Sequence, residues 1–142
     1  MKIVIIGSMK FADKMLDAQK ILQDLGHEVV VPYDTKMCAD NPECDFASDP
    51  EHFKTYDDII KAHFDLIVPR DAILVLNYPK NDINGYVGGS TLMEMGIAHH
   101  FNKKIFLLFD PPLEKDIRYA IEINLMKPIV LGGDVNNIIN HL

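Results

Sequence analysis

The sequence predicts a Rossmann-like α/β fold: a doubly wound, about five-stranded parallel sheet with helices on both faces. Three observations lead to this fold class. Short β-branched apolar runs alternate along the chain with longer segments whose apolar residues recur at helical spacing. The runs are apolar throughout, which is typical of parallel strands buried on both faces. At 142 residues, 48% of them hydrophobic, the chain fits a single domain over residues 1–142.

The first part of the chain is predicted to form a strand–helix–strand unit. Residues 2–8, KIVIIGS, form the first expected strand, and residues 10–26 form a helix that stops at its final glycine. Residues 27–32, HEVVVP, form the second strand, so a right-handed parallel crossover is expected. Residues 33–50 are acidic, contain two prolines and show no apolar period. We therefore expect a long loop there, able to act as a lid.

The alternation continues to the end of the chain. Residues 50–69 are expected to form a helix, because Pro50 suits its first turn and an apolar stripe ends at Ile67. The remaining predicted elements are strands at 71–79, 103–112 and 127–133, helices at 90–102, 113–126 and 134–142, and a polar loop at 79–90.

Composition narrows the classes of partner. The formal net charge of −7 and the pI near 5.2 argue against binding a nucleic-acid backbone, but not against a small anion held by backbone N–H groups. No apolar run approaches membrane length and no signal peptide is recognisable, so a cytoplasmic protein without a membrane partner is expected. The spacing of Cys38 and Cys44 fits no zinc pattern, so we expect two free loop thiols and no metal.

Ligands of such sheets bind at the carboxyl ends of the strands, which here carry Gly7, Ser8, Asn77 and Asp110. After the first strand, the Ser8 hydroxyl and the start of a helix suit a phosphate or carboxylate, and Lys10 adds positive charge. The competing interpretation is a plain tight turn in which Ser8 only caps the helix.

The segment GYVGGST precedes a helix and offers a second candidate loop. Gly88 and Gly89 let the backbone approach a ligand closely. Ser90 or Thr91 is the candidate N-cap, which makes Glu94 the acidic member of a capping box. The alternative is a nucleophile, because Glu94 has apolar neighbours and a poorly solvated carboxylate near a helix N-terminus is suited to attack. Both interpretations stay open.

Three stretches together resemble the nucleoside 2-deoxyribosyltransferase superfamily, including its branch of 2'-deoxynucleoside 5'-phosphate N-hydrolases. They are IVIIGS, DAILVLN and GYVGGSTLMEMGIAHHFNKKIFLLFDPP. The most specific part is an E-x-G-x-A core at Glu94, Gly96 and Ala98. The resemblance implies a Rossmann-like fold without a cofactor. It also implies a glutamate nucleophile that attacks C1' of a deoxyribose and expels the base.

The resemblance also implies roles for single residues. Glu94 takes the nucleophile's role, and Ser8 contacts the sugar or its 5'-phosphate. The family's aspartate before the third strand falls near His63 by spacing and reaches Asp65 with a gap, so Asp65 is the expected acid. A neighbouring subunit often completes the site, which implies a homo-oligomer. The expected substrate-binding residues are Gly7, Ser8, Lys10, Phe11, Asn77, Gly88, Gly89 and Ser90.

Three functions are compatible with these features. The first is an N-glycosyl hydrolase or transferase acting on a 2'-deoxynucleoside or its 5'-monophosphate. The second is a non-catalytic nucleotide-binding or sensing protein, favoured because Val4 and Ile5 stand where the family has a tyrosine and because the family's aspartate does not align cleanly. The third is a phosphoribohydrolase of the lysine-decarboxylase-like kind. For that group, GGSTLME keeps two glycines, the threonine and the glutamate of P-G-G-x-G-T-x-x-E, but lacks the proline and the third glycine.

Overall fold

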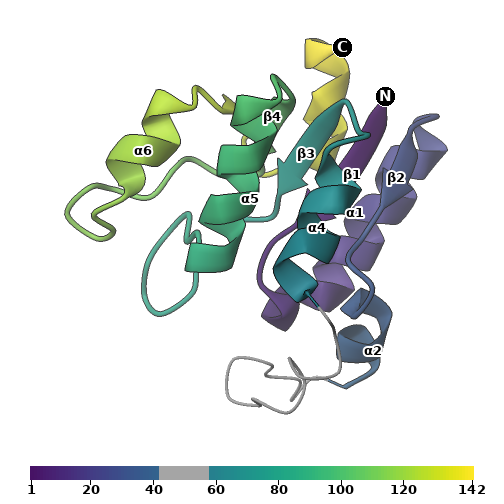
Figure 1. Ribbon diagram of the computed structural model, residues 1–142, viewed down its shortest axis with the longest axis horizontal. Helices are drawn as coiled ribbons and strands as arrows, with labels where there is room; N and C mark the ends of the chain where they lie inside the picture. Colours follow the sequence, from purple (N-terminus) through teal and green to yellow (C-terminus); the bar gives the residue numbers. More distant parts are fainter. Residues whose placement is uncertain (42–57) are drawn as a thin grey trace.

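A computed structural model describes residues 1–41 and 58–142, and these residues form the predicted α/β fold (Figure 1). The described part contains a sheet whose five strands are all parallel and lie in the order β2-β1-β3-β4-β5. The strands are β1 Lys2–Ile6, β2 Glu28–Val30, β3 Ala72–Val75, β4 Lys104–Leu107 and β5 Ile129–Val130.

The strand order reverses between β1 and β3. From β1 the chain first adds β2 on one side, and it then crosses over to add β3 and the later strands on the other side. The register pairs Ile3 with Ala72 and Ile6 with Val75, so both strands end at the same edge. Ligands of doubly wound sheets bind in the crevice outside such a reversal. The loops that follow β1 and β3 are therefore the expected place for a site.

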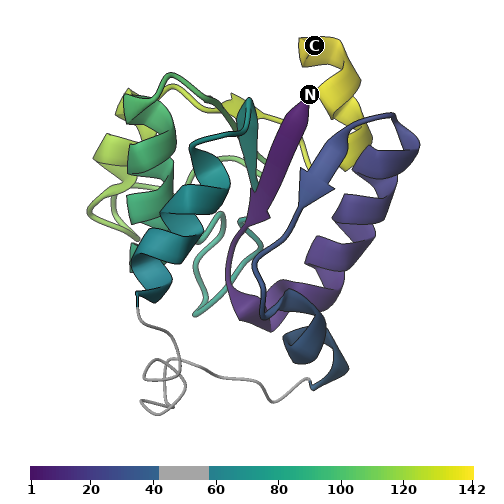
Figure 2. The same ribbon diagram turned by 45° about the vertical axis from the view of Figure 1, so that its right-hand side comes forward.

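Helices cover both faces of the sheet (Figures 1 and 2). Because side chains alternate along a strand, Ile3 and Ile5 point to one face and Val4 and Ile6 to the other. On the first face lie α1 (Ala12–Asp24) and the 3-10 helix η3 (Val135–His141), and on the second lie α4 (Ile59–Ile67), α5 (Gly89–His100) and α6 (Ala120–Leu125).

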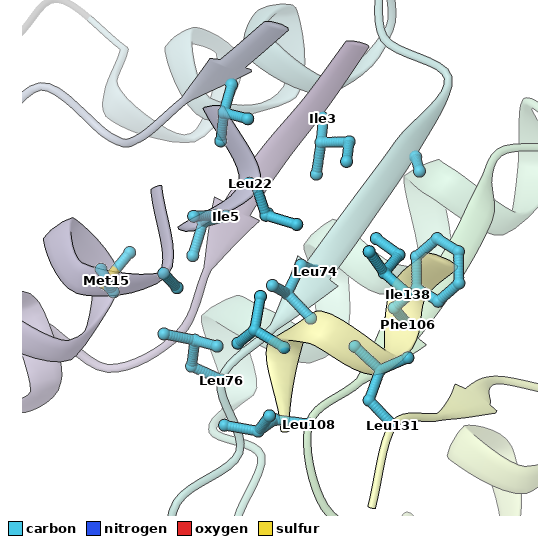
Figure 3. Packing of buried hydrophobic residues seen from close by; sticks show 14 residues of the cluster. Ile3, Ile5, Met15, Leu22, Leu74, Leu76, Phe106, Leu108, Leu131 and Ile138 are labelled. Carbon is cyan, nitrogen blue, oxygen red and sulfur yellow. The ribbon is translucent and has the colours of Figure 1, made fainter. Parts of the chain in front are cut away.

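The core under α1 is apolar throughout. Met15 and Leu22 from α1 meet Ile5 and Leu74 from the sheet, and Ile138 of η3 closes the far side (Figure 3). All five side chains are buried. Burying a side chain of this size contributes about 1.5–3 kcal/mol, so this face supplies a large share of the stability.

The expected loop at 33–50 is wrong for its first part. Residues Thr35–Asp40 form the helix α2, and the Thr35 hydroxyl donates a hydrogen bond of 2.8 Å to the carbonyl of Pro32. This local bond and the close packing of α2 on α1 stabilise a helix that lacks a periodic sequence. Cys38 on α2 is disulfide-bonded, so the expectation of a free thiol is also wrong there. Residues 42–50 of the expected loop, which include Cys44, lie outside the described residues.

Three helices differ in extent from the prediction. The described part of the second predicted helix begins at Ile59, where the Asp58 carboxylate accepts a hydrogen bond from the Lys61 amide. The predicted helix at 113–126 is regular only in α6, because turns occupy the residues before it. The last helix is present but is of the 3-10 type. A further 3-10 turn, η1 (Met9–Phe11), precedes α1.

Candidate active site

Glu94 is a charged side chain that the fold buries on the second face. Its side chain lies in α5 and only 7% of the residue is exposed. The helix follows directly from the loop after β3, so its first turns lie near the carboxyl edge of the sheet. The neighbouring helix α4 packs beside it and supplies His63, whose Nδ1 lies 2.8 Å from Glu94 Oε1.

The capping-box interpretation of Glu94 is wrong. The N-cap of helix α5 is Gly88, three residues before Thr91, and it makes no side-chain capping bond. Glu94 is therefore the sixth helical residue instead of the third, and that position lies beyond the first turn where a carboxylate caps. Its burial and its hydrogen bond to His63 come from tertiary packing instead.

The surroundings of His63 favour its protonated, positively charged form. The hydrogen bond to Glu94 raises the pKa of the imidazole above its usual value, partial burial lowers it, and the charges of Glu94 and Asp34 raise it further. The net effect is a raised pKa. A protonated imidazole that donates from Nδ1 to a buried carboxylate is a charge-assisted hydrogen bond, which is among the stronger polar contacts in proteins.

Asp34 brings a second buried carboxylate to this region. It stands between β2 and α2 with 9% exposure, close enough for its charge to raise the pKa of His63. Sequence reasoning missed this residue because it lies in the segment that was expected to be a loop. A signal was nevertheless present, since Asp34 follows the carboxyl end of a predicted strand in the same way as Ser8 and Asn77 do.

Asp65, the expected acid, does not join Glu94. Its carboxylate is 66% exposed and lies 3.6 Å from Lys61 Nζ, one turn earlier on the same helix. Residues two apart on an α-helix point about 200° apart around the axis, so His63 and Asp65 face different directions. His63, and not Asp65, is the α4 residue that contacts Glu94.

The loop after β1 brings Ser8 together with a lysine that sequence reasoning missed. Ser8 Oγ accepts a hydrogen bond from the Lys10 amide at 3.3 Å, which caps η1, and another from Lys80 Nζ at 3.1 Å. Lys80 is held by a two-residue turn in which Asn81 and Asp82 adopt positive φ. The ammonium group also lies 5.6 Å from the ring centre of Tyr86. A fixed cation therefore stands beside the candidate serine.

At two glycines of this edge, the backbone of a neighbouring loop comes too close to leave room for a side chain. Gly7 has φ of 152°, and a Cβ there would lie 3.1 Å from the Leu76 carbonyl oxygen. Gly85 has φ of 69°, and a Cβ there would lie 2.2 Å from the Asp110 carbonyl oxygen. Farther along, the Tyr119 hydroxyl donates to the Val87 carbonyl. Both glycines are thus required by the packing of neighbouring loops.

Asn77 and Phe11 have structural partners. Asn77 donates through Nδ2 to the carbonyls of Phe109 and Asp110 and accepts from the Phe109 amide at 2.9 Å, so its amide is fully used in joining the ends of β3 and β4. The Phe11 ring packs on Tyr78, which in turn packs on Phe109, with 5.2 Å between ring centres in each pair. These contacts form the floor between the loops after β1, β3 and β4.

The other expected binding residues have few partners. Gly88 is extended and lies beside the Tyr86 ring, Gly89 has nothing near its missing Cβ, and Ser90 is exposed. Lys10 lines a surface depression between the start of α1 and α2. That depression includes neither Glu94 nor His63, so Lys10 does not line the buried pair there.

Residues 1–41 and 58–142 contain neither a metal-binding cluster nor a membrane-spanning helix. No group of three or more histidine, cysteine, aspartate or glutamate side chains is placed to hold a metal ion there. Among the helices of the same residues, none is long and apolar enough to cross a membrane.

The arrangement can perform nucleophilic and acid–base chemistry. Glu94 provides a carboxylate that is largely screened from water, and His63 provides a proton next to it. Ser8 and Lys80 provide a hydroxyl and a cation on the loops at the carboxyl edge. A buried carboxylate with an adjacent proton donor is a combination that enzymes use to form and resolve covalent intermediates.

Comparison with known proteins gives a structural match without a family assignment. No family model and no curated protein matches the sequence. Among solved structures, the CMP N-glycosidase BcmB of Clostridium botulinum matches with a TM-score of 0.51 and 20% sequence identity. The match covers 99% of this chain and 96% of that chain. The chain therefore has the overall fold of this N-glycosidase.

Proposed function

We propose that this protein cleaves the bond between base and sugar in a nucleoside or its 5'-monophosphate, as an N-glycosyl hydrolase or transferase. In this proposal Glu94 attacks C1' of the sugar, the base leaves, and a glycosyl–enzyme ester remains on the carboxylate. Water resolves the ester in a hydrolase, and a second base resolves it in a transferase. The family resemblance favours a 2'-deoxynucleoside or its 5'-monophosphate.

One observation carries this proposal: a carboxylate that is more than nine-tenths buried faces a histidine 2.8 Å away, instead of capping its own helix. A buried ion pair contributes little to stability compared with apolar residues of the same volume, so its presence at this edge of the sheet is explained more simply by a chemical role. The overall match to a CMP N-glycosidase supports the same reaction class. The expected Ser8 contact to phosphate gains support from Lys80, which adds a cation at that hydroxyl.

The test is release of free base. The protein is incubated with each common 2'-deoxynucleoside, each ribonucleoside and their 5'-monophosphates, and free base is separated by chromatography. Glu94→Gln keeps the size and hydrogen-bonding capacity of the side chain but removes the nucleophilic charge. We expect it to lower the rate roughly 1,000-fold or more, since loss of a nucleophile removes the covalent route.

The matched control is Glu122→Gln, the same substitution at an exposed residue of α6. It should leave the rate unchanged. Base release by Glu94→Gln at the wild-type rate would disprove the nucleophile. The preferred substrate also decides between alternatives, because preference for ribonucleoside monophosphates would favour the phosphoribohydrolase reading over the deoxyribosyl one.

A second candidate function is nucleotide binding without turnover. It is favoured by the position of Asp65, because the expected acid is exposed and bonded to Lys61 instead of facing Glu94. Calorimetric titration with the same substrates tests it. Micromolar binding without base release from any of them would support a sensor and contradict the glycosidase.

The proposed homo-oligomer is a separate question. Both helices that carry the buried pair also expose large apolar side chains, Ile60 on α4 and Met93 on α5. Exposed apolar groups near a site are candidates for contact with a second copy. Light scattering coupled to size-exclusion chromatography gives the mass in solution, and a monomer at assay concentration that still turns over would contradict completion of the site by a neighbour.

A further inference from the structure

We propose that His63 is the acid that protonates the departing base, and that His63 and Glu94 act as one charge-balanced pair. The inference rests on the proposed function and assigns the proton that the reaction needs. His63 uses Nδ1 to bond Glu94 at 2.8 Å. In the described part of the chain its Nε2 has no hydrogen-bond partner, and a quarter of the side chain remains exposed. The free nitrogen is therefore available to a bound substrate.

The first half of the reaction balances in atoms and charge. An oxygen of the Glu94 carboxylate forms a bond to C1' of the sugar, the C1'–N bond breaks, and its electron pair goes to the base. The Nε2 proton of His63 moves to that base, which leaves neutral. The imidazole becomes neutral and keeps its Nδ1 hydrogen bond to the glutamate, which is now an ester. Glutamate and histidine have no net charge together before and after the step.

The second half returns the proton. A water molecule attacks C1' of the ester, neutral His63 accepts one proton of that water at Nε2, and the C1'–O bond breaks. Its electron pair goes back to Glu94, which becomes a carboxylate again, and the free sugar leaves. The resting pair of imidazolium and carboxylate is restored. One histidine thus serves as acid in the first half and as base in the second.

Because the site is buried, an acid that is paired with the carboxylate of Glu94 is more favourable there than an acid without a partner. An uncompensated charge in a poorly hydrated site is costly, and here the positive charge disappears in the same step as the negative one. Among residues 1–41 and 58–142, the charged groups that act on His63 from other elements are the carboxylates of Glu94 on α5 and Asp34 after β2. On its own helix Lys61 and Asp65 pair with each other on a different face. Both facing carboxylates favour the protonated imidazole.

The experiment compares two leaving groups in the variant His63→Asn. The asparagine amide can take the place of Nδ1–H toward Glu94, but it cannot donate a proton to the base. The substrates are the best natural substrate from the base-release panel and its N7-methylguanine counterpart, whose base is already cationic and leaves without protonation. His99→Asn, the same substitution at an exposed histidine of α5, is the control.

For His63→Asn we expect kcat/KM to fall roughly 100-fold or more on the natural substrate, the size typical of lost acid catalysis. On the N7-methylguanine substrate, kcat/KM of the same variant should fall by less than about a tenth of that factor. A small fall would also show that the variant still forms the site. The wild-type rate on the natural substrate should decline at alkaline pH as His63 deprotonates, and this decline should be absent from the variant.

Equal losses on both substrates would overturn the inference and leave His63 as a support for Glu94. Wild-type activity together with an unimpaired His63→Asn would overturn it as well. Absence of base release by the wild-type protein from every substrate is a different result, because it contradicts the proposed function itself.

Discussion

The two faces of the sheet are built from similar strands but bury different side chains. Helix α1 on the first face buries four residues, Ala12, Met15, Ala18 and Leu22, and all of them are apolar. Helix α5 on the second face also buries four, and two of these are Thr91 and Glu94. The first face can be explained by folding alone, whereas the second carries a charge that folding does not require.

The buried residues of the first face are explained by their contribution to stability, whereas the buried charge of the second face is explained by chemistry. Replacing a buried ion pair by apolar residues of similar volume is often neutral or even stabilising, so the pair of His63 and Glu94 is weak as a stability device. A carboxylate in such a place is explained more simply by reactivity. Substitutions in the apolar core of the first face should therefore mainly lower stability, and substitutions of the buried pair should mainly lower base release.

The largest expected change in stability belongs to the apolar face. Leu22→Ala removes a fully buried side chain of α1 that packs against the sheet. The free energy of unfolding should fall by about 2–5 kcal/mol, since both transfer energy and a cavity contribute. Urea unfolding followed by circular dichroism measures it. Leu25→Ala at the exposed end of α1 is the matched control, and a similar loss in both variants would contradict this account of the core.

The next prediction concerns the polar face and its dependence on pH. The folded-state pKa of His63 is raised, so its contribution to stability is complete below the unfolded-state pKa of about 6.5 and is lost as pH rises through the folded-state pKa. The asparagine amide can keep a hydrogen bond to Glu94 but not the positive charge, so His63→Asn should lower the free energy of unfolding by about 1–2 kcal/mol near pH 6 and by less at pH 9 or so. Thermal unfolding of both proteins across this range measures the difference.

The other histidines are common to both proteins, so their titration cancels in that difference. A gap between wild type and variant that widened toward alkaline pH would show the opposite sign. Such a result would mean that Glu94 and His63 are not held as a carboxylate and an imidazolium in the folded state.

The sequence was sufficient for the fold because its signals are local and repeated. The β-branched runs and the helical stripes need no partner to be recognised, and the structure confirms the parallel sheet that they predict. Local signals failed where tertiary contacts decide. Ser90 and Thr91 are good N-caps in isolation, yet α5 starts at Gly89, and α2 forms where no period exists.

The site was predicted only in part for the same reason. Glu94 stood out by its apolar neighbours, but nothing near it in the sequence indicates that its partner lies 31 residues earlier. Lys80 reaches Ser8 across 72 residues through a turn that only the structure reveals. Asp34 could have been chosen by its place after a strand. Whether these residues act on a substrate stays a prediction.

The next prediction concerns Ser8 and Lys80, which lie in the loops at the carboxyl edge of the sheet and are not part of the buried pair of His63 and Glu94. If the two groups hold a 5'-phosphate, Lys80→Ala should raise KM for a nucleoside monophosphate about tenfold, or about 1.4 kcal/mol. KM for the matching nucleoside and both kcat values should change little. Lys103→Ala serves as a control, because Lys103 follows α5 at the opposite edge of the sheet, just before β4. An equal rise in KM for nucleoside and monophosphate would exclude phosphate recognition by Lys80.

The smallest effect is expected at Asp65, and it tests the comparison between two residues of one helix turn. Asp65→Asn breaks only an exposed ion pair with Lys61, so the free energy of unfolding should change by less than about 0.5 kcal/mol. Base release should stay within about a factor of two of the wild-type rate, because the carboxylate is on a different helix face from His63. A fall as large as that of His63→Asn would show that Asp65 reaches the substrate after all. The proton of the leaving base would then come from the residue that the family resemblance implied, and the pair of His63 and Glu94 would keep only a positioning role.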